Sequence, residues 1–330
     1  MSGSLQHFVG EEGGASSLLF YGPKKTPQML AELEFETTEG INTYHVRLAH
    51  AANDALIFLD ESVSFSRHTI PGRATPITLD VGHRETKLKE FGQSGDPRAR
   101  TARHTQWLLG QCRVFQFHDT SKEARVRQQW NLDDNGYLKS DAANLAAILF
   151  KLQETESACY QRIVATIRQI APFFDDFILK PLALNPNRIS LRWKERDSDV
   201  EFGPHQLSDG TLRAMALVTL LLQPEEDLPR VIIVDEPELG LHPYAICVLA
   251  SLLKKAACHS QIVLATQSIG LLDHFELEDV VVVERSEGTS GHGERSSEFI
   301  RHDPEKLRDW LTEYSLSELW EKNVLGGRPS

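Results

Sequence analysis

The residues best suited to chemistry follow a short apolar run in the second half of the chain. Residues 231–234 (Val-Ile-Ile-Val) lead directly into Asp235 and Glu236. Apolar runs of this length are typical of buried parallel strands, and α/β sheets bind ligands at the carboxyl ends of such strands. An aspartate there can supply an oxygen ligand to Mg²⁺, and a glutamate can orient water for attack on a γ-phosphate. The alternative interpretation is a strand that merely ends in acidic turn residues.

A second group of candidate residues precedes a helical apolar pattern. Residues 208–211 (Ser-Asp-Gly-Thr) come directly before the run 212–222. The free N–H groups and positive dipole at a helix N-terminus favour a phosphate, and Gly210 would let the backbone approach it. Taken alone, the cluster is better explained by a Ser208 or Asp209 side chain that only caps the helix.

The elements that must position these residues form a βαβ unit. Runs 231–234 and 261–265 are predicted to be buried parallel strands. The helix between them should open at His242-Pro243 and end near Lys254-Lys255.

Earlier elements follow from the same kind of periodicity. Alternating apolar residues between 33 and 65 predict antiparallel strands, and the helical period between 140 and 173 predicts two amphipathic helices. Residues 189–193 alternate as one strand, and the Gly-, Ser- and Glu-rich segment 285–298 is predicted to be a surface loop.

Three motifs in this order resemble those of ABC-type ATPases. Residues 207–211 are similar to the signature motif, and residues 231–243, with Asp-Glu-Pro-Glu-Leu-Gly-Leu-His-Pro, are similar to a Walker B strand and D-loop. Residues 264–268 (Leu-Ala-Thr-Gln-Ser) lie where such proteins have their switch residue. The combination resembles the RecF-like and SMC-like AAA ATPases, a group that includes OLD-type and other phage-defence ATPases. The resemblance implies an α/β P-loop NTPase fold, an ABC-type ATPase head with an antiparallel β lobe and an inserted helical lobe.

The resemblance also implies roles for single residues. Asp235 would hold Mg²⁺, Glu236 would polarise the hydrolytic water, and ATP would be the nucleotide. Gln267 stands where many relatives have a histidine that senses the γ-phosphate. A glutamine can hydrogen-bond a phosphate or water but cannot become charged, so we expect slow or differently gated turnover.

Two heads of this kind pack head to tail, so the resemblance implies a homodimer with shared sites. Ser208, Asp209 and Gly210 would contact ATP held by the opposite subunit, while Gly240 and His242 would lie at the dimer seam. Such an arrangement is isologous.

One expected motif is missing from the sequence. The P-loop string G-x-x-x-x-G-K-[ST] occurs nowhere in the 330 residues, and Gly22-Pro-Lys-Lys-Thr lacks the second glycine. We therefore expect the chain to start just after the P-loop helix of its relatives. By itself it should hydrolyse ATP weakly or not at all, and a longer parent protein would be the ATPase. The predicted domains are a β lobe at 1–100, a helical lobe at 101–185 and the ATPase core at 186–330.

Composition limits the partners and the compartment. The chain has 41% hydrophobic residues, a net charge of −12, no leader-like start and no apolar run long enough for a membrane span, which favours the cytoplasm. Residues 83–127 hold ten Lys or Arg against five Asp or Glu. DNA is thus an expected partner only through the resemblance, and a solvated loop with solvated helix faces explains this basic stretch better than a binding patch does.

The expected function is ATP binding and hydrolysis in DNA repair or mobile-element defence. The alternative is a hydrolysis-deficient chain that presents residues 208–211 and a dimer surface to a nucleotide-loaded subunit or an effector protein. An intrinsic nuclease is disfavoured, since the carboxylates are already used and the thirteen histidines show no metal-binding spacing.

Overall fold

The computed structural model describes residues 4–70, 72, 74–287 and 295–327 of the chain. It divides into two compact units, residues 1–112 and residues 113–330, which are described separately. In the described part of the chain, no helix has the length and apolar character needed to cross a bilayer.

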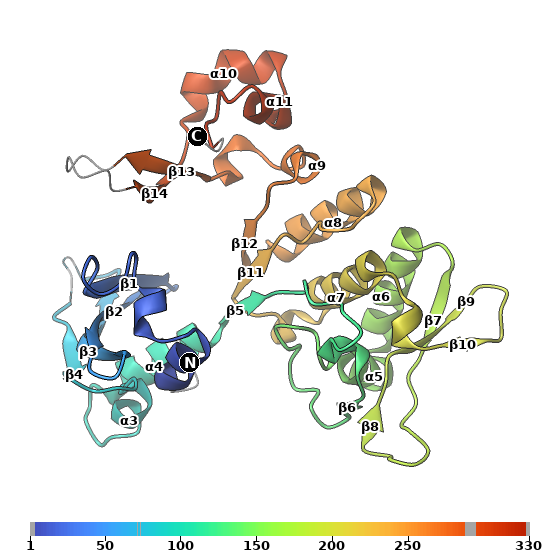
Figure 1. Cartoon of the computed structure of the whole chain (residues 1–330), viewed down its shortest axis with the longest axis horizontal. Helices are drawn as coiled ribbons and strands as arrows, with labels where there is room; N and C mark the ends of the chain where they lie inside the picture. The colour runs from blue at the N-terminus through green and yellow to red at the C-terminus, as the bar shows by residue number, and fades with distance from the viewer. Residues whose placement is uncertain (1–3, 71, 73, 288–294, 328–330) are drawn as a thin grey trace. The chain divides into compact units, whose positions relative to one another are not determined.

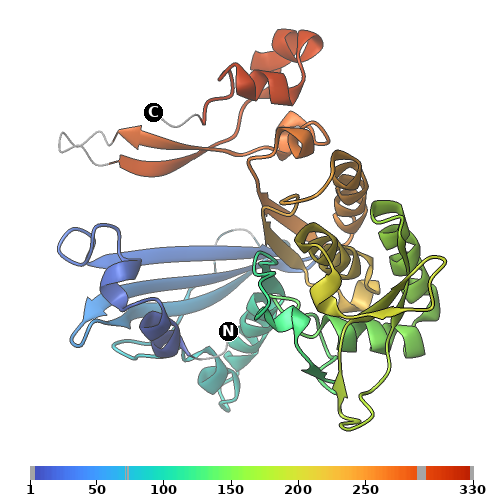
Figure 2. The ribbon, with the colours of Figure 1, turned by 45° about the vertical axis from the view of Figure 1, so that its right-hand side comes forward.

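The first unit is built on a four-stranded antiparallel meander with the order β1-β2-β3-β4 (Figure 1). Its strands are β1 (Gln28–Glu36), β2 (Gly40–Ala51), β3 (Ala55–Arg67) and β4 (Ile77–Asp80). Its helices are α1 (Leu5–Glu11), α2 (Ala15–Leu18), α3 (Leu88–Gly92) and α4 (Ala99–Gly110). Figure 2 shows the long strands side by side. The predicted alternation between 33 and 65 is therefore confirmed.

Helices α3 and α4 bury one face of this sheet. Leu88, Ala102 and Leu109 from the helices pack against Tyr44 and Val63 from the strands. The opposite face of α4 points to solvent, because its exposed residues recur at helical spacing: Arg100, Arg103, His104 and Trp107.

The second unit contains a three-stranded sheet with the order β12-β11-β5. The strands are β5 (Cys112–Phe115), β11 (Val231–Asp235) and β12 (Gln261–Ala265), and β11 pairs with β12 in parallel. Helix α8 (Pro243–Ala256) connects β11 to β12, so the predicted βαβ unit is confirmed. Among the described strands, β12 pairs only with β11, and Val263 on it is 45% exposed.

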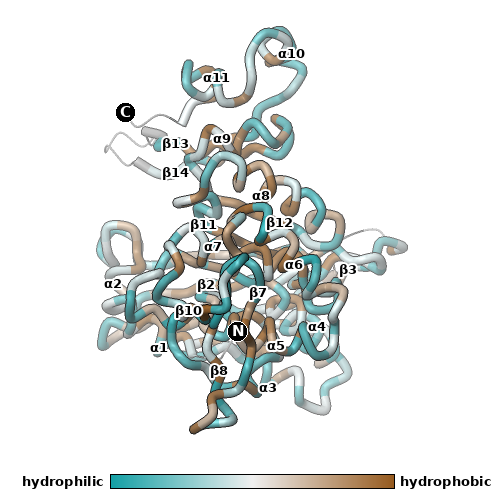
Figure 3. Tube along the Cα trace, turned by 90° about the vertical axis from the view of Figure 1, so that its right-hand side faces the viewer, coloured by the Kyte–Doolittle hydropathy of each residue, from teal (hydrophilic) through white to brown (hydrophobic). Residues whose placement is uncertain are grey.

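Four helices form the largest core of the second unit with this sheet. They are α5 (Leu145–Thr155), α6 (Ser157–Ile170), α7 (Asp209–Leu222) and α8, and their apolar faces interlock in one cluster that includes β11. Brown, apolar stretches mark these helices in Figure 3. The two helices predicted between 140 and 173 are confirmed by α5 and α6.

Smaller elements complete the second unit. The short strands are β6 (Trp130–Asn131), β7 (Phe174–Ile178), β8 (Arg188–Ile189), β9 (Arg192–Glu195) and β10 (Glu201–Phe202). Single turns of 3₁₀ helix lie at Arg125–Arg127, Pro204–Gln206, Glu225–Asp227 and Leu277–Asp279. At the C-terminal end, α9 (Ile269–Leu272), β13 (Val282–Glu287), β14 (Arg295–Ile300), α10 (Pro304–Glu313) and α11 (Leu316–Glu321) surround a separate small core.

Two predictions of local structure are wrong. The strand predicted over 189–193 is interrupted, because Ile189 ends β8 and pairs with β6, whereas Trp193 lies in β9 and pairs with β7 and β10. The loop predicted over 285–298 is shorter than expected, because its two ends belong to strands. β13 and β14 pair as an antiparallel hairpin, from the pair Val282 and Ile300 to the pair Glu287 and Arg295. The rest of that prediction, residues 288–294, lies outside the described residues.

Candidate functional site

The two acidic residues lie at the carboxyl end of β11. Asp235 is the last residue of the strand and is in register with Ala265 of β12. The Glu236 amide extends the ladder by donating to the Ala265 carbonyl at 2.8 Å. Glu236 also has a φ of +39°, a left-handed conformation that is rare for a residue with a side chain and is often found at functional sites.

Gln267 approaches Glu236 from the loop that follows β12. Its Nε2 donates to Glu236 Oε1 at 3.4 Å. Residues that are 31 positions apart in sequence are thus brought together, as expected of the carboxyl ends of adjacent parallel strands.

Helix α7 begins with the second group of candidate residues. Ser208 is its N-cap, and Ser208 Oγ accepts from the Thr211 amide at 3.2 Å and contacts Thr211 Oγ1 at 2.8 Å. Capping is therefore one role that Ser208 performs. Ser208 and Asp209 are both exposed, so their polar groups can also be reached from solvent.

The start of α7 touches the loop after β11 through two glycines. A Cβ atom built on Gly210 would lie 2.2 Å from the Gly240 carbonyl oxygen, so only glycine fits there without a backbone shift. Gly240 has a φ of +77°, which glycine adopts easily. This contact joins the signature-like segment to the D-loop-like segment within one chain.

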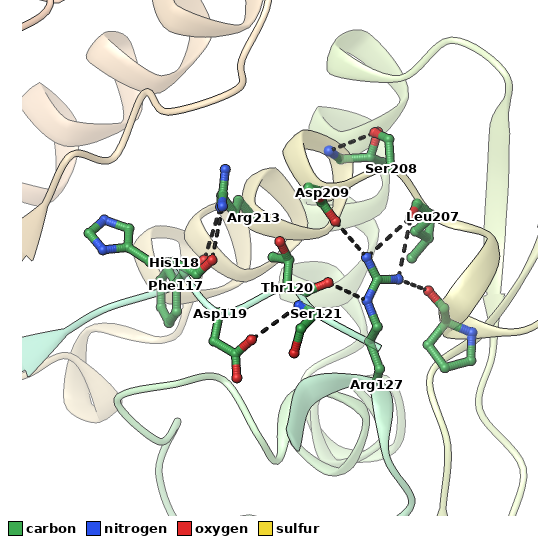
Figure 4. A network of polar contacts seen from close by, with 12 residues as sticks. Phe117, His118, Asp119, Thr120, Ser121, Arg127, Leu207, Ser208, Asp209 and Arg213 are labelled. Carbon is green, nitrogen blue, oxygen red and sulfur yellow. Dashed lines mark hydrogen bonds and ion pairs between the residues drawn. The ribbon is translucent and has the colours of Figure 1, made fainter. Parts of the chain in front are cut away.

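The Arg127 side chain forms hydrogen bonds with residues at the start of α7 (Figure 4). Its side chain is 5% exposed and donates to three backbone carbonyls and one carboxylate. Its partners are Thr120 O at 2.9 Å, Leu207 O at 3.3 Å, Asp209 Oδ1 at 2.9 Å and Pro204 O. Arg127 belongs to the basic stretch 83–127, but its burial removes it from any nucleic-acid surface.

Arg213, one turn into α7, hydrogen-bonds to two other segments of the chain, and Figure 4 shows its contacts with the segment after β5. Its guanidinium donates to Phe117 O at 3.1 Å, His118 O at 2.9 Å and Leu239 O at 3.2 Å. The His118 ring in turn lies 3.0 Å, through Nε2, from the Asp235 carbonyl oxygen. The segment after β5 is therefore attached both to α7 and to the end of β11.

His242 has a structural role in this fold. It is the N-cap of α8, where its Nδ1 accepts from the Tyr244 amide at 3.3 Å, and Pro243 is the first helical residue, as predicted. Leu239 and Tyr244 beside it are 41% and 56% exposed, an unusual amount of apolar surface for so short a segment.

The residues at the end of β11 fit a Mg²⁺ ion that also binds phosphate. No group of three potential metal-binding side chains occurs among the described residues. Mg²⁺ does not require one, because it is commonly held by one or two carboxylates together with water and substrate phosphates. The half-buried carboxylate of Asp235 makes no hydrogen bond within the described structure and is suited to this role.

Sequence patterns assigned no role to four residues of this network: His118, Arg127, Arg213 and Glu238. Each acts through a contact with a segment at least 28 residues away. His118 lies three residues after the end of β5, the strand beside β11, but no strand was predicted there from the sequence. Periodicity contains no information on such long-range hydrogen bonds.

Comparisons with known proteins agree with the α/β architecture. Residues 74–273 match the family described as "AAA domain, putative AbiEii toxin, Type IV TA system". A search of curated proteins finds no match.

Solved structures similar to this chain include heads of SMC proteins. The SMC head bound to the C-winged helix domain of ScpA shares 13% identity, with 92% of this chain and 84% of that chain covered and a TM-score of 0.49. The Pyrococcus furiosus SMC head bound to the C-terminal domain of ScpA shares 14% identity, with 94% and 87% covered and a TM-score of 0.43.

The fold is that of a P-loop NTPase of the AAA type, with an α/β core. The family match covers more than half of the 330 residues, so the chain belongs to this AAA family. Its class is therefore that of ATPases.

Proposed function

We propose that this chain forms the catalytic head of a RecF-like ATPase that acts in DNA repair or mobile-element defence. The main support is the contact between Gln267 and Glu236 at the carboxyl ends of two adjacent parallel strands. The family description, which mentions a toxin and a toxin–antitoxin system, favours defence over repair. Four free cysteines suit the cytoplasm as the site of action.

Each residue of the site has a role in this proposal. Asp235 would hold Mg²⁺, which neutralises phosphate charge when bound. Glu236 accepts a hydrogen bond from Gln267, so its carboxylate is oriented before any water molecule arrives. Ser208 and Gly210 would offer their hydroxyl and amide to the γ-phosphate of ATP in the opposite subunit of a head-to-tail dimer. The exposed Leu239 and Tyr244 would pack at that dimer seam.

The first experiment measures ATP hydrolysis by the protein at saturating Mg²⁺ and ATP. Glu236→Gln keeps the shape of the side chain but removes its basicity, so we expect turnover to fall roughly 10²-fold or more. Glu226→Gln, at an exposed acid outside the site, is the matched control. Measurable turnover that is equal in Glu236→Gln and in the unsubstituted protein would contradict the proposal.

A second candidate function follows from the missing P-loop string. The chain could present residues 208–211 and Gly240 to a nucleotide-loaded subunit or an effector protein without hydrolysing ATP itself. A titration with a fluorescent ATP analogue and Mg²⁺ separates the two functions. Binding that Asp235→Ala abolishes would support the ATPase, whereas absence of binding would favour the partner role.

DNA is proposed as a partner because of the solvent face of α4. Arg100 and Arg103 form no ion pair within the described structure, and one turn later Trp107 is 50% exposed and stacked on His104 at 5.6 Å. Cations can bind phosphates, and an exposed indole can stack on a base. Arg98 is less suitable, since its pair with Asp96 at 2.7 Å lowers the pKa of that carboxyl to about 2.

Gel-shift titrations at several salt concentrations test this surface. Arg100→Gln with Arg103→Gln should weaken binding and reduce the salt slope by about 0.9 for each phosphate that is no longer neutralised. Lys306→Gln, on an exposed face of α10, is the control and should change neither. An unchanged slope in the double variant would exclude the α4 surface.

A further inference from the structure

Glu238 is a buried carboxylate whose hydrogen bonding is incomplete. It follows Glu236 by two residues and is 9% exposed. Its Oε1 accepts from Thr266 Oγ1 at 2.5 Å, but its buried Oε2 has no hydrogen-bond partner among the described residues. A buried carboxylate oxygen without a donor is destabilising, so this arrangement requires a reason other than stability.

Thr266 is fixed between Glu238 and its own loop. Its hydroxyl donates to Glu238 and accepts from the Ser268 amide at 2.9 Å. A threonine hydroxyl has a single proton, so both contacts together determine its orientation. Thr266 directly precedes Gln267, whose side chain reaches Glu236.

Two side-chain contacts therefore connect the loop after β11 to the end of β12, in addition to the backbone hydrogen bond from the Glu236 amide to the Ala265 carbonyl. One is Glu236 with Gln267, and the other is Glu238 with Thr266. The first contact is long, at 3.4 Å, and joins two side chains that are at least partly accessible. The second is short and involves a buried carboxylate, so of the two side-chain contacts it is the one better able to hold the Gln267 loop in place beyond the backbone ladder.

We propose that Glu238 is a positioning residue that sets Gln267 against Glu236 through Thr266. This role rests on the proposed ATPase function, because it concerns the residues that would orient the attacking water. Glu238 would not contact nucleotide or water itself. It would keep two loops from separate strands in register at the point where their side chains must meet.

The first test uses hydrogen–deuterium exchange on the whole protein and does not depend on turnover. Thr266→Val removes the hydroxyl with little change of shape, and Thr266→Ser keeps it. We expect Thr266→Val and Glu238→Leu each to speed amide exchange about ten-fold in both segments, 236–241 and 266–268. Thr266→Ser should behave like the unsubstituted protein. If each variant affects only its own segment, the proposed coupling is wrong.

The second test measures ATP hydrolysis with the same variants. Thr266→Val and Glu238→Leu should each lower kcat about ten-fold and change KM for ATP less than about two-fold. The double variant should be no slower than either single variant, because both remove the same contact.

The controls separate failure of this inference from failure of the ATPase proposal. If Glu236→Gln lowers turnover but Thr266→Val does not, Glu238 has no positioning role. If Glu236→Gln leaves turnover unchanged, the ATPase proposal fails, and the exchange data alone decide whether the two loops are coupled. Full activity in Thr266→Ser together with reduced activity in Thr266→Val would support the role of the hydroxyl.

Discussion

The two units of the chain bury polar side chains for different purposes. In the first unit, Glu61 is fully buried, and its oxygens accept from the Tyr44 hydroxyl at 2.7 Å, the Lys87 amide at 2.9 Å and the Thr86 hydroxyl. In the second unit, Arg127 is buried but its carboxylate partner Asp209 is 63% exposed. The buried hydrogen bonds of Glu61 can only stabilise the fold. Those of Arg127 extend to the exposed Asp209 and can therefore also position residues at the surface.

The carboxylates show the same contrast. Glu61 has donors on both oxygens, and Glu238 has a donor on only one. Incomplete satisfaction of a buried group costs stability, and such groups are expected near sites rather than in cores. The contrast is between these two carboxylates, because the first unit also holds buried polar atoms without a hydrogen-bond partner among the described residues: Asn42 Nδ2, His83 Nε2 and Thr105 Oγ1.

The largest expected effect is at Glu61. Glu61→Ala would leave the buried Tyr44 hydroxyl and the Lys87 amide without an acceptor, so we expect the free energy of unfolding to fall by about 3–5 kcal/mol. Urea unfolding of the whole chain measures this decrease. Glu12→Ala, at an exposed glutamate of the same unit, should cost little. A small decrease at Glu61 would remove the basis for calling its network structural.

A smaller decrease in stability is expected at Arg127. Arg127→Met keeps most of the buried volume but leaves the carbonyls of Thr120 and Leu207 without their donor, at a cost of about 2–3 kcal/mol. Turnover should fall further than stability explains, because Asp209 and the start of α7 lose their support. If turnover is normal at temperatures where the variant is fully folded, Arg127 does not position the site.

Gly210 tests the contact between α7 and the loop after β11. Gly210→Ala places a methyl group against the Gly240 carbonyl, so the two backbones must separate at a cost of about 1–3 kcal/mol. Thermal unfolding measures the cost. Gly136→Ala is the control, since a Cβ there meets nothing within 4 Å. Equal melting temperatures for the two variants would show that the backbones at Gly210 and Gly240 can separate at little cost in free energy.

The smallest effect concerns pH. Burial, followed by the charge of Glu61, raises the pKa of Tyr44 above its ordinary value of 10.0. The folded state keeps the Tyr44 hydroxyl protonated at pH values where the unfolded chain has already lost this proton. The free energy of unfolding is therefore unaffected by Tyr44 ionisation below about pH 10, and above it this free energy falls by about 1.4 kcal/mol per pH unit. Tyr44→Phe should reduce the slope of unfolding free energy between about pH 10 and pH 11.5.

Tyr160 in the second unit offers a comparison for this measurement. Burial and the hydrogen bond to Asp176 also raise its pKa, so Tyr160→Phe should reduce the slope by a similar amount. An unchanged slope in Tyr44→Phe would mean that the Glu61 network opens before the tyrosine ionises.

Elements defined by nearby residues were predictable from the sequence. The βαβ unit around Asp235 follows from two apolar runs and a Pro at the first helical position, and it alone brings Glu236 and Gln267 to one edge. The break between β8 and β9 was not predictable, because Ile189, Leu191 and Trp193 alternate without interruption while their strands join different sheets.

The supporting residues of the site were beyond sequence reasoning for a related reason. Arg127 lies in a basic stretch and has the appearance of a surface residue, yet it is buried by segments 77 to 82 residues further along the chain. Arg213 lies among the apolar residues of α7, and its three carbonyl partners come from two distant loops. Local patterns describe which face of an element is apolar, and tertiary contacts decide what a charged side chain does there.

The contact between Gly210 and Gly240 also limits what sequence variation can reveal about this protein. A glycine in a phosphate-binding motif is usually explained by the space that the ligand needs. Here Gly210 would have to remain a glycine even in a relative that no longer bound nucleotide, because the Gly240 carbonyl occupies the space of a side chain. Its retention among relatives would therefore be evidence for the fold, whereas variation at Asp235, Glu236 and Gln267 would follow the chemistry.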